Sequence, residues 1–312
     1  MSDAQFVNAV DALDTWRDDV LAGKPPTFYK VGKGDLERIE IGPKLVTLVG
    51  GAPGAGKTAW VMQCVIDALR LNPGLRACVC NVEMPPEVLL DRQLARLSGI
   101  DVQTIRYRRL AADHADRIDQ AICTLKSVAN RLCFVRPPFG LENIAATADA
   151  FDAGLIVLDY IQRIAPPGTH GDKRSSVDAT MEHLRNFADA GVAVIVVAAV
   201  GRTKDKQGRS SYDGDGLNLA SFRESSELEF GADDAFILVP HSKEPTQVVL
   251  RHLKARHTEP RDLTLEFDRS CQYFKPVGGP WNPDGDAGTL SPAISSAWQR
   301  ATAATEESDG DF

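Results

Sequence analysis

Residues 51–58 read Gly51-Ala-Pro-Gly-Ala-Gly-Lys-Thr58 and match the pattern G-x-x-x-x-G-K-[ST]. The run Leu45–Val49 before them is apolar and typical of a buried strand, and a helical pattern follows them. Glycine lets a backbone wrap closely around phosphate groups, while backbone N–H groups and a helix N-terminus supply positive potential. Because both flanks fit, the sequence predicts a strand, a phosphate-binding loop and a helix rather than a chance glycine-rich turn.

The loop also predicts which residues contact a nucleoside triphosphate. Lys57 is expected to reach the β- and γ-phosphates, and the Thr58 hydroxyl is expected to be a ligand of Mg²⁺. The predicted nucleotide-binding residues are Gly51, Ala52, Pro53, Gly54, Ala55, Gly56, Lys57 and Thr58.

Short β-rich runs alternate with helical patterns from residue 44 onward. The predicted strands are Leu45–Val49, Ala77–Val82, Leu132–Val135, Leu155–Leu158, Val192–Ala198, Ala235–Val239, Val248–Leu253 and Leu263–Phe267. Helical segments separate the first five, which predicts an α/β fold with a doubly wound, mainly parallel sheet. The last three follow one another closely and are predicted to add as antiparallel strands at one edge.

Composition and charge exclude several classes of protein. The 312 residues are 43% hydrophobic and 25% charged, as in a globular protein rather than a disordered or disulfide-scaffold chain. No apolar run reaches the roughly 18 residues that a membrane-spanning helix needs. The first residues, Met-Ser-Asp-Ala-Gln, do not resemble a signal peptide, so we expect a cytoplasmic protein without a membrane partner.

Charge and composition divide the chain into three predicted parts. Residues 1–24 contain an amphipathic helical pattern at 4–21, residues 25–276 form the α/β body, and residues 277–312 form a disordered acidic tail. The net charge of −8 arises at the ends, because removing residues 1–21 and 277–312 leaves 33 basic and 32 acidic residues. A neutral body of this kind can still carry a local basic surface for nucleic acid.

Two carboxylates follow predicted strands directly. Asp159 ends the run Leu155–Leu158, and ligands of open α/β sheets gather at such carboxyl ends, so Asp159 is predicted to hold Mg²⁺. Glu83 follows Ala77–Val82 and precedes a helix that begins after Met84. A carboxylate there can orient an attacking water, or it can be a first-turn acid that the helix dipole favours. The residue pattern alone leaves both roles for Glu83 open.

Four further segments occur in order between about residues 22 and 276. They are Asn81-Val-Glu-Met-Pro-Pro-Glu-Val-Leu-Leu-Asp-Arg-Gln-Leu-Ala-Arg-Leu-Ser98, Asp159-Tyr-Ile-Gln162, Phe222-Arg-Glu-Ser225 with Gly231-Ala-Asp233, and Leu253-Lys-Ala-Arg256. In this order they resemble the motor domain of the bacterial replicative DNA helicases, the DnaB-like family.

The resemblance implies a RecA-like P-loop NTPase core with ATP at the subunit interfaces of a ring, commonly a hexamer. It implies an ATP-dependent DNA helicase or translocase that acts on single-stranded DNA. In this reading Glu83 is the base that activates water, Lys57 binds the reacting phosphates, and Arg256 with Lys254 reaches into the neighbouring subunit's ATP. Arg223 and Glu224 correspond to the loop that faces DNA.

One departure from the family pattern concerns coupling between ATP and DNA. The family has Ser-Gln where this chain has Ala198-Ala199, and that glutamine senses the γ-phosphate. Arg202, shortly after it, is retained and is the predicted coupling residue. The alternative reading is a RecA-like ATPase switch or assembly module that binds ATP without unwinding DNA. The acidic tail, which ends in Phe312, is a predicted contact for a replication-protein partner.

Overall fold

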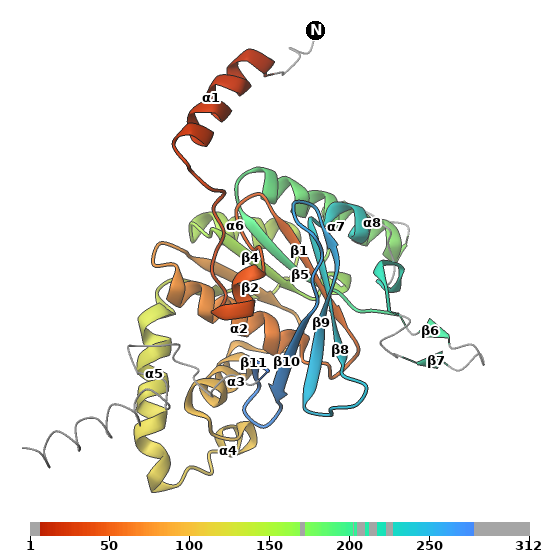
Figure 1. Cartoon of the computed structure of the whole chain (residues 1–312). Helices are drawn as coiled ribbons and strands as arrows, with labels where there is room; N and C mark the ends of the chain where they lie inside the picture. Colours follow the sequence, from red (N-terminus) through yellow and green to blue (C-terminus); the bar gives the residue numbers. More distant parts are fainter. Residues whose placement is uncertain are drawn as a thin grey trace, which may run out of the picture. The chain divides into compact units, whose positions relative to one another are not determined.

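A nine-stranded sheet of order β11-β10-β9-β8-β1-β5-β4-β2-β3 is the core of the α/β body that precedes residue 278 (Figure 1). The computed structural model describes residues 7–168, 172–201, 203–204, 210–211, 217–222 and 227–277. The strands of the sheet are β1 (Val46–Gly51), β2 (Ala77–Asn81), β3 (Leu132–Phe134), β4 (Leu155–Asp159), β5 (Ala193–Val197), β8 (Asp234–Pro240), β9 (Gln247–Ala255), β10 (Leu263–Asp268) and β11 (Tyr273–Pro276). A separate pair joins β6 (Thr203–Lys204) and β7 (Ser210–Ser211) in antiparallel orientation.

Helices cover both faces of the sheet. The α-helices are α1 (Ala9–Leu21), α2 (Lys57–Leu71), α3 (Pro86–Ser98), α4 (Val102–Arg106), α5 (Ala115–Ala129), α6 (Leu141–Ala150), α7 (Lys173–Asp189) and α8 (Glu227–Gly231). Short 3₁₀ turns occur at η1 (Gly34–Arg38), η2 (Ala112–His114), η3 (Ile161–Arg163) and η5 (Leu219–Ser221). Buried side chains of α2, α3 and α5 join the core on one face, and those of α6, α7 and α8 join the core on the other. The predicted doubly wound α/β fold is therefore confirmed.

The orientation predicted for one strand is wrong. β8 pairs in parallel with β1, whereas the sequence predicted antiparallel addition from residue 235 onward. Within the nine-stranded sheet, the antiparallel pairs of the described strands are β8 with β9, β9 with β10 and β10 with β11. The connection to β8 contains the helix α8, which is only five residues long and therefore too short to show a helical period in the sequence. The four-residue strand β11 was not predicted at all.

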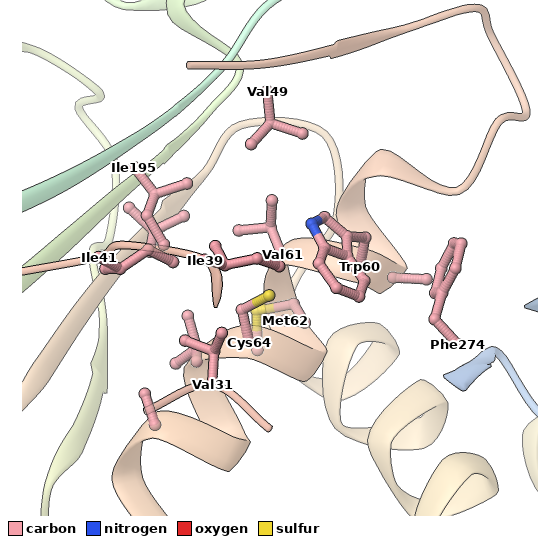
Figure 2. Close-up of a cluster of buried hydrophobic side chains, with 14 of the residues drawn as sticks. Val31, Ile39, Ile41, Val49, Trp60, Val61, Met62, Cys64, Ile195 and Phe274 are labelled. Carbon is pink, nitrogen blue, oxygen red and sulfur yellow. The ribbon is translucent and has the colours of Figure 1, made fainter. Parts of the chain in front are cut away.

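The apolar core under α2 explains why the phosphate-binding loop has a fixed position. Figure 2 shows Trp60 and Val61 of α2 beside apolar side chains of β1, β5 and the segment before β1. Trp60 meets the ring of Phe274 in β11 edge to face, with ring centroids 5.5 Å apart. Each aromatic side chain of this kind contributes a large buried apolar area. The core thus anchors the first turns of the helix that follows the loop.

The β10–β11 hairpin packs directly against the phosphate-binding loop. Gln63 of α2 exchanges two hydrogen bonds with the backbone of Phe274, of 2.7 and 2.9 Å, which fixes β11 to the helix. Phe274 stacks on Phe267 with centroids 4.0 Å apart. A Cβ atom on Gly56 would lie 2.8 Å from Phe274 and 2.9 Å from Phe267, and Gly56 has a φ of +94°. Both its conformation and its neighbours therefore require glycine at this position.

We expect Gly56→Ala to lower the free energy of unfolding by about 1–3 kcal/mol, because it overpacks the contact between loop and hairpin and strains the backbone. Urea denaturation followed by circular dichroism measures the change. Gly74→Ala is the matched control, since a Cβ there meets no atom within 4 Å. Equal stability of the two variants would contradict the packing described here.

The N-terminal helix presents its apolar side chains to solvent. α1 begins at Ala9, after Asn8, whose side chain accepts a hydrogen bond from the Val10 N–H. Residues 7 and 8 of the predicted helix 4–21 lie before its first turn, and residues 4–6 lie outside the described residues. Val10, Leu13, Trp16, Val20 and Leu21 are each more than half exposed. Among the helices that the structure describes, none is long and apolar enough to cross a bilayer.

Candidate nucleotide-binding site

The loop between β1 and α2 has the conformation that its glycines predict. Gly54 and Gly56 have φ values of +77° and +94°, and α2 begins at Lys57. The Lys57 ammonium folds back over the loop and donates to the carbonyl oxygens of Gly51 at 2.7 Å and Ala52 at 3.1 Å. A loop with this shape surrounds an anion with backbone N–H groups at the N-terminus of a helix.

The two predicted Mg²⁺ ligands contact each other. The Thr58 hydroxyl donates to Asp159 Oδ2 at 2.6 Å, and the Asn81 amide donates to the same oxygen at 2.8 Å. β2 and β4 are neighbouring parallel strands, and their register places Asn81 opposite Asp159. The carboxyl ends of these strands therefore bring Asp159 to the first turn of α2.

Asn81 also positions the segment that carries Glu83. Its Oδ1 atom accepts hydrogen bonds from the backbone N–H groups of Glu83 at 3.0 Å and Met84 at 2.8 Å. One amide side chain thus joins the turn after β2 to the carboxylate at the end of β4. The Glu83 side chain is exposed and lines the same pocket as Lys57.

These groups surround one pocket of about 850 Å³. One wall is the phosphate-binding loop, a second carries Glu83 and Asp159, and a third comes from the β10–β11 hairpin. The lining residues are Pro53, Gly54, Gly56, Lys57, Thr58, Val82, Glu83, Met84, Arg92, Asp159, Tyr160, Arg163, Ala199, Phe267, Arg269 and Gln272. The volume is within the range of small-molecule and cofactor sites.

Burial shifts the pKa values of two charged groups in the pocket in opposite directions. Burial lowers the pKa of Lys57 below its ordinary value, while Asp159 and Glu83 act against this shift. Burial raises the pKa of Asp159, while the hydrogen bond from Thr58 opposes the shift. Each charged form is therefore less favourable here than in water, and a ligand of complementary charge would relieve that cost.

We expect Asp159→Asn to raise the free energy of unfolding of the nucleotide-free protein at neutral pH. Burial raises the folded pKa of Asp159 above its unfolded value, so ionisation costs folding free energy as the pH rises from the unfolded pKa through the folded pKa. Asparagine keeps an oxygen that accepts from Thr58 and Asn81. The same variant should lose Mg²⁺-dependent nucleotide affinity. Chemical denaturation at pH 7 measures the change in stability, and ATP titrations in Mg²⁺ and in EDTA measure the change in affinity. A variant that is less stable than the unsubstituted protein would show that the ionised Asp159 does not cost folding free energy.

The oxygen donors fit a magnesium ion that is shared with phosphate groups. Thr58 and Asp159 offer hard hydroxyl and carboxylate oxygens. Within the described ranges, no three His, Cys, Asp or Glu side chains form a metal cluster. Mg²⁺ in such sites typically takes one or two protein ligands and completes its shell with phosphate oxygens and water. When bound, it would neutralise charge on the phosphate oxygens.

Comparisons with known proteins agree with this geometry. The family model of the DnaB-like helicase C terminal domain matches residues 34–276, which is most of the chain. The chain belongs to the DnaB-like helicase C-terminal domain family. A solved ATPase domain superposes with a TM-score of 0.76 at 18% identity, covering 88% of this chain and all of the other. A DnaB-like replicative helicase, solved in a study of its interactions with primase, gives a TM-score of 0.74 at 18% identity, covering 88% of this chain and 68% of the other.

The DnaB-like domain does not bring Arg256 and Lys254 to its own pocket. Arg256 is 44% exposed on its side chain and pairs with Asp233 at 2.7 Å, at the end of β9. Asp233 is buried and also pairs with Arg185 at 2.6 Å. Lys254 donates to the carbonyl oxygens of Glu229 at 2.6 Å and Ala232 at 2.7 Å, so it caps the end of α8. Neither cation lines the pocket of the same chain.

Ala199, which stands where the family has the glutamine that senses the γ-phosphate, lines the pocket. The backbone N–H of Ala199 donates to Gln162 Oε1 at 3.2 Å, so a glutamine from the turn after β4 contacts the residue where the family has its sensing glutamine. The Nε2 atom of Gln162 is buried and has no hydrogen-bond partner among the residues that the structure describes. The predicted coupling residue Arg202 and the predicted DNA-facing residues Arg223 and Glu224 lie outside the described residues.

Several lining residues of the DnaB-like domain were not predicted. Arg92, Arg163 and Arg269 line the pocket, and Arg269 also donates to the Gly54 carbonyl at 2.9 Å. Each lies far from the phosphate-binding loop in sequence and belongs to no short motif. Arg92 did stand inside the segment that resembles the family, so its polar position on α3 was an available but unspecific signal.

Proposed function

We propose that this chain is the motor domain of an ATP-dependent DNA helicase or translocase of the replicative type. In this proposal it hydrolyses ATP at the subunit interfaces of a ring and acts on single-stranded DNA. One observation carries it: a DnaB-like domain places Lys57, Thr58, Asp159 and Glu83 around one pocket and leaves Arg256 outside that pocket. A complete site would then need Arg256 from a second subunit.

Lys57 binds the triphosphate in this proposal. Its ammonium would exchange the carbonyl oxygens of Gly51 and Ala52 for phosphate oxygens, which carry far more negative charge. This exchange favours the charged amine and therefore opposes the pKa shift that burial causes. Lys57 should thus contribute mainly to ground-state binding.

Glu83 orients the attacking water. Its exposed carboxylate lines the same pocket as Lys57, on a turn that Asn81 holds by accepting two backbone hydrogen bonds. A carboxylate in this position accepts a hydrogen bond from water and aligns it with the terminal phosphoryl group, where positioning is the main source of rate. The resemblance of residues 81–98 to the family supports this role over that of a first-turn acid.

Arg256 completes the neighbouring subunit's site, with Lys254 beside it. Asp233 already holds the Arg256 guanidinium by one bond and leaves its side chain 44% exposed. A cation that reaches into a site from another subunit stabilises the negative charge that builds up on the transferred phosphoryl group. The exposed apolar side chains of α1 also support assembly into a homo-oligomer, for which we propose a hexamer.

The remaining partners follow from the family and from the sequence. Arg223 and Glu224 are proposed to face single-stranded DNA, and Arg202 is proposed to couple that contact to ATP. One structural relative was solved in a study of its interactions with primase, which supports a replication partner for this chain as well. The acidic tail, 277–312, is the proposed contact for such a partner in the cytoplasm.

A second candidate function is an ATPase switch or assembly module that does not unwind DNA. Ala199 favours it, because its side chain has neither donor nor acceptor with which to sense the γ-phosphate. Loss of one phosphate-linked hydrogen bond would reduce coupling by about 1–3 kcal/mol.

We expect single-stranded DNA to stimulate the ATPase activity only modestly, and Ala199→Gln to increase that stimulation. Arg223→Ala should weaken DNA binding and flatten its salt dependence, because it removes a phosphate contact. Steady-state ATPase assays with and without oligonucleotide, together with binding titrations at several salt concentrations, measure both effects. If DNA neither binds nor stimulates either form, the motor proposal fails and the switch module is left.

A further inference from the structure

Asp233 is a buried carboxylate outside the pocket that pairs with two arginines at once. It directly precedes β8, and only 2% of its side chain is exposed. Its Oδ2 atom pairs with Arg185 of α7 at 2.6 Å and accepts the Val46 N–H at 2.8 Å. Its Oδ1 atom pairs with Arg256, directly after β9, at 2.7 Å. The two arginines thus occupy different oxygens of one carboxylate.

Arg256 is the more exposed of the two cations. Its side chain is 44% exposed, and its guanidinium pairs with Asp233 through one nitrogen. In the proposed role of Arg256, phosphate oxygens of the neighbouring subunit's ATP compete with Asp233 for this guanidinium. Removing the only cation from a buried carboxylate would leave an uncompensated charge, which is strongly unfavourable. The release of Arg256 therefore depends on what else pairs with Asp233.

Arg185 is held by the body of its own subunit. Its guanidinium also donates to the Lys44 carbonyl oxygen at 2.6 Å and to Asp189 Oδ1 at 3.0 and 3.1 Å. These partners lie in the segment before β1 and at the end of α7, so they are independent of β9. Arg185 can therefore stay on Asp233 when Arg256 leaves.

Lys254 is another cation near Asp233, and the negative charge of Asp233 acts on it. Its ammonium donates to the carbonyl oxygens of Glu229 and Ala232 at the end of α8. A move to Asp233 would take a donor away from these carbonyl oxygens, which costs free energy where they are buried. Arg185 is thus better placed than Lys254 to balance the charge of Asp233.

We propose that Arg185 is a positioning residue for Arg256. While Arg185 and the Val46 N–H hold Oδ2, Asp233 can give up Arg256 without becoming an unpaired buried charge. Within the described ion pairs, removal of Arg185 leaves Asp233 with Arg256 alone, and Asp233 then holds Arg256 in its own subunit. This inference rests on the proposed role of Arg256 and adds to it a residue of α7 that does not line the pocket.

Arg185→Met should lower kcat for ATP hydrolysis about ten- to 100-fold and change the KM for ATP less than about threefold, because the ATP pocket is intact and Arg256 is retained. Arg185→Lys should stay within about fivefold of the unsubstituted kcat, since the bond to Asp233 uses one nitrogen and lysine keeps the charge. Asp189→Ala removes an exposed partner of Arg185 and should leave kcat unchanged. Steady-state ATPase assays on the full chain measure all three variants.

Mixing experiments separate a defect in Arg256 release from a defect in the subunit's own pocket. Arg185→Met subunits retain Glu83, so mixing them with Glu83→Gln subunits, which supply a free Arg256, should restore part of the turnover. Mixing them with Arg256→Ala subunits should restore nothing, because neither variant then supplies a free Arg256. The opposite pattern, restoration by Arg256→Ala and not by Glu83→Gln, overturns the inference.

A double variant keeps the test decisive if Arg185→Met folds poorly. Arg185→Met with Asp233→Asn leaves no buried charge at position 233 and no ion pair to hold Arg256, so kcat should return to within about fivefold of the unsubstituted value. A double variant with a kcat as low as that of Arg185→Met, or an unchanged kcat in Arg185→Met, overturns the inference and leaves the proposed function standing. Full turnover by Arg256→Ala would overturn the proposed role of Arg256 together with this inference.

Discussion

Glu83→Gln should bind ATP with nearly unchanged affinity and lose turnover by about 10²–10⁴-fold. Glutamine keeps the size of the side chain and can still contact water, but it cannot accept the proton. Lys57→Ala should show the opposite pattern, because Lys57 interacts with phosphate already in the ground state. Single-turnover hydrolysis and equilibrium binding of a fluorescent ATP analogue separate the two effects.

The chain offers a matched control for Glu83. Glu87 lies four residues later, in the first turn of α3, is exposed, and does not line the pocket. Glu87→Gln should therefore hydrolyse ATP at the rate of the unsubstituted protein. Near-normal hydrolysis by Glu83→Gln would remove Glu83 from the role of base and would restore its reading as a first-turn acid that the helix dipole favours.

Arg256→Ala should reduce turnover by about 10³-fold or more and leave the fold intact. Asp233 would keep its ion pair with Arg185 and its hydrogen bond from the Val46 N–H, so no buried charge is abandoned. Mixing Arg256→Ala subunits with Glu83→Gln subunits should then restore part of the activity. In rings assembled at random from equal amounts of the two variants, about one interface in four joins an intact Glu83 to an intact Arg256.

A control variant and a dilution experiment test whether Arg256 acts in the site of the neighbouring subunit. Arg261→Ala removes an exposed arginine that pairs only at 3.9 Å with Glu259, and it should neither lose activity nor complement Glu83→Gln. Activity that stays proportional to concentration down to a demonstrable monomer would show that each subunit hydrolyses ATP alone. In that case Arg256 would act only through its ion pair with Asp233.

The parallel part of the fold was predictable because its signals are local. β1, β2, β4 and β5 are apolar runs between clear helical patterns, and each lies within one or two residues of its prediction. The orientation of β8 was not predictable, because α8, the α-helix described in the connection from β5 to β8, is only five residues long and too short to show a helical period. The strand β11 depends on a tertiary contact, the pair of hydrogen bonds to Gln63, rather than on its own four residues.

The residues of the site likewise divide into those that the sequence predicts and those that it does not. Lys57, Thr58 and Asp159 meet as expected, because a phosphate-binding loop and a neighbouring strand end are fixed by the topology of the sheet. Arg92, Arg163 and Arg269 reach the pocket from three different elements, and only the packing of α3, η3 and the β10–β11 hairpin brings them there. The spacing of residues along the chain does not predict such packing.

Strand displacement on a forked DNA substrate tests the central claim, an ATP-driven motor on DNA, most directly. The unsubstituted chain should release the labelled strand when ATP and Mg²⁺ are present, and it should release none with ADP. Glu83→Gln at the same concentration should bind the fork and release nothing. ATP hydrolysis by the unsubstituted chain without any strand release, across concentrations at which it is assembled on the fork, would contradict the motor and leave the switch module as its function.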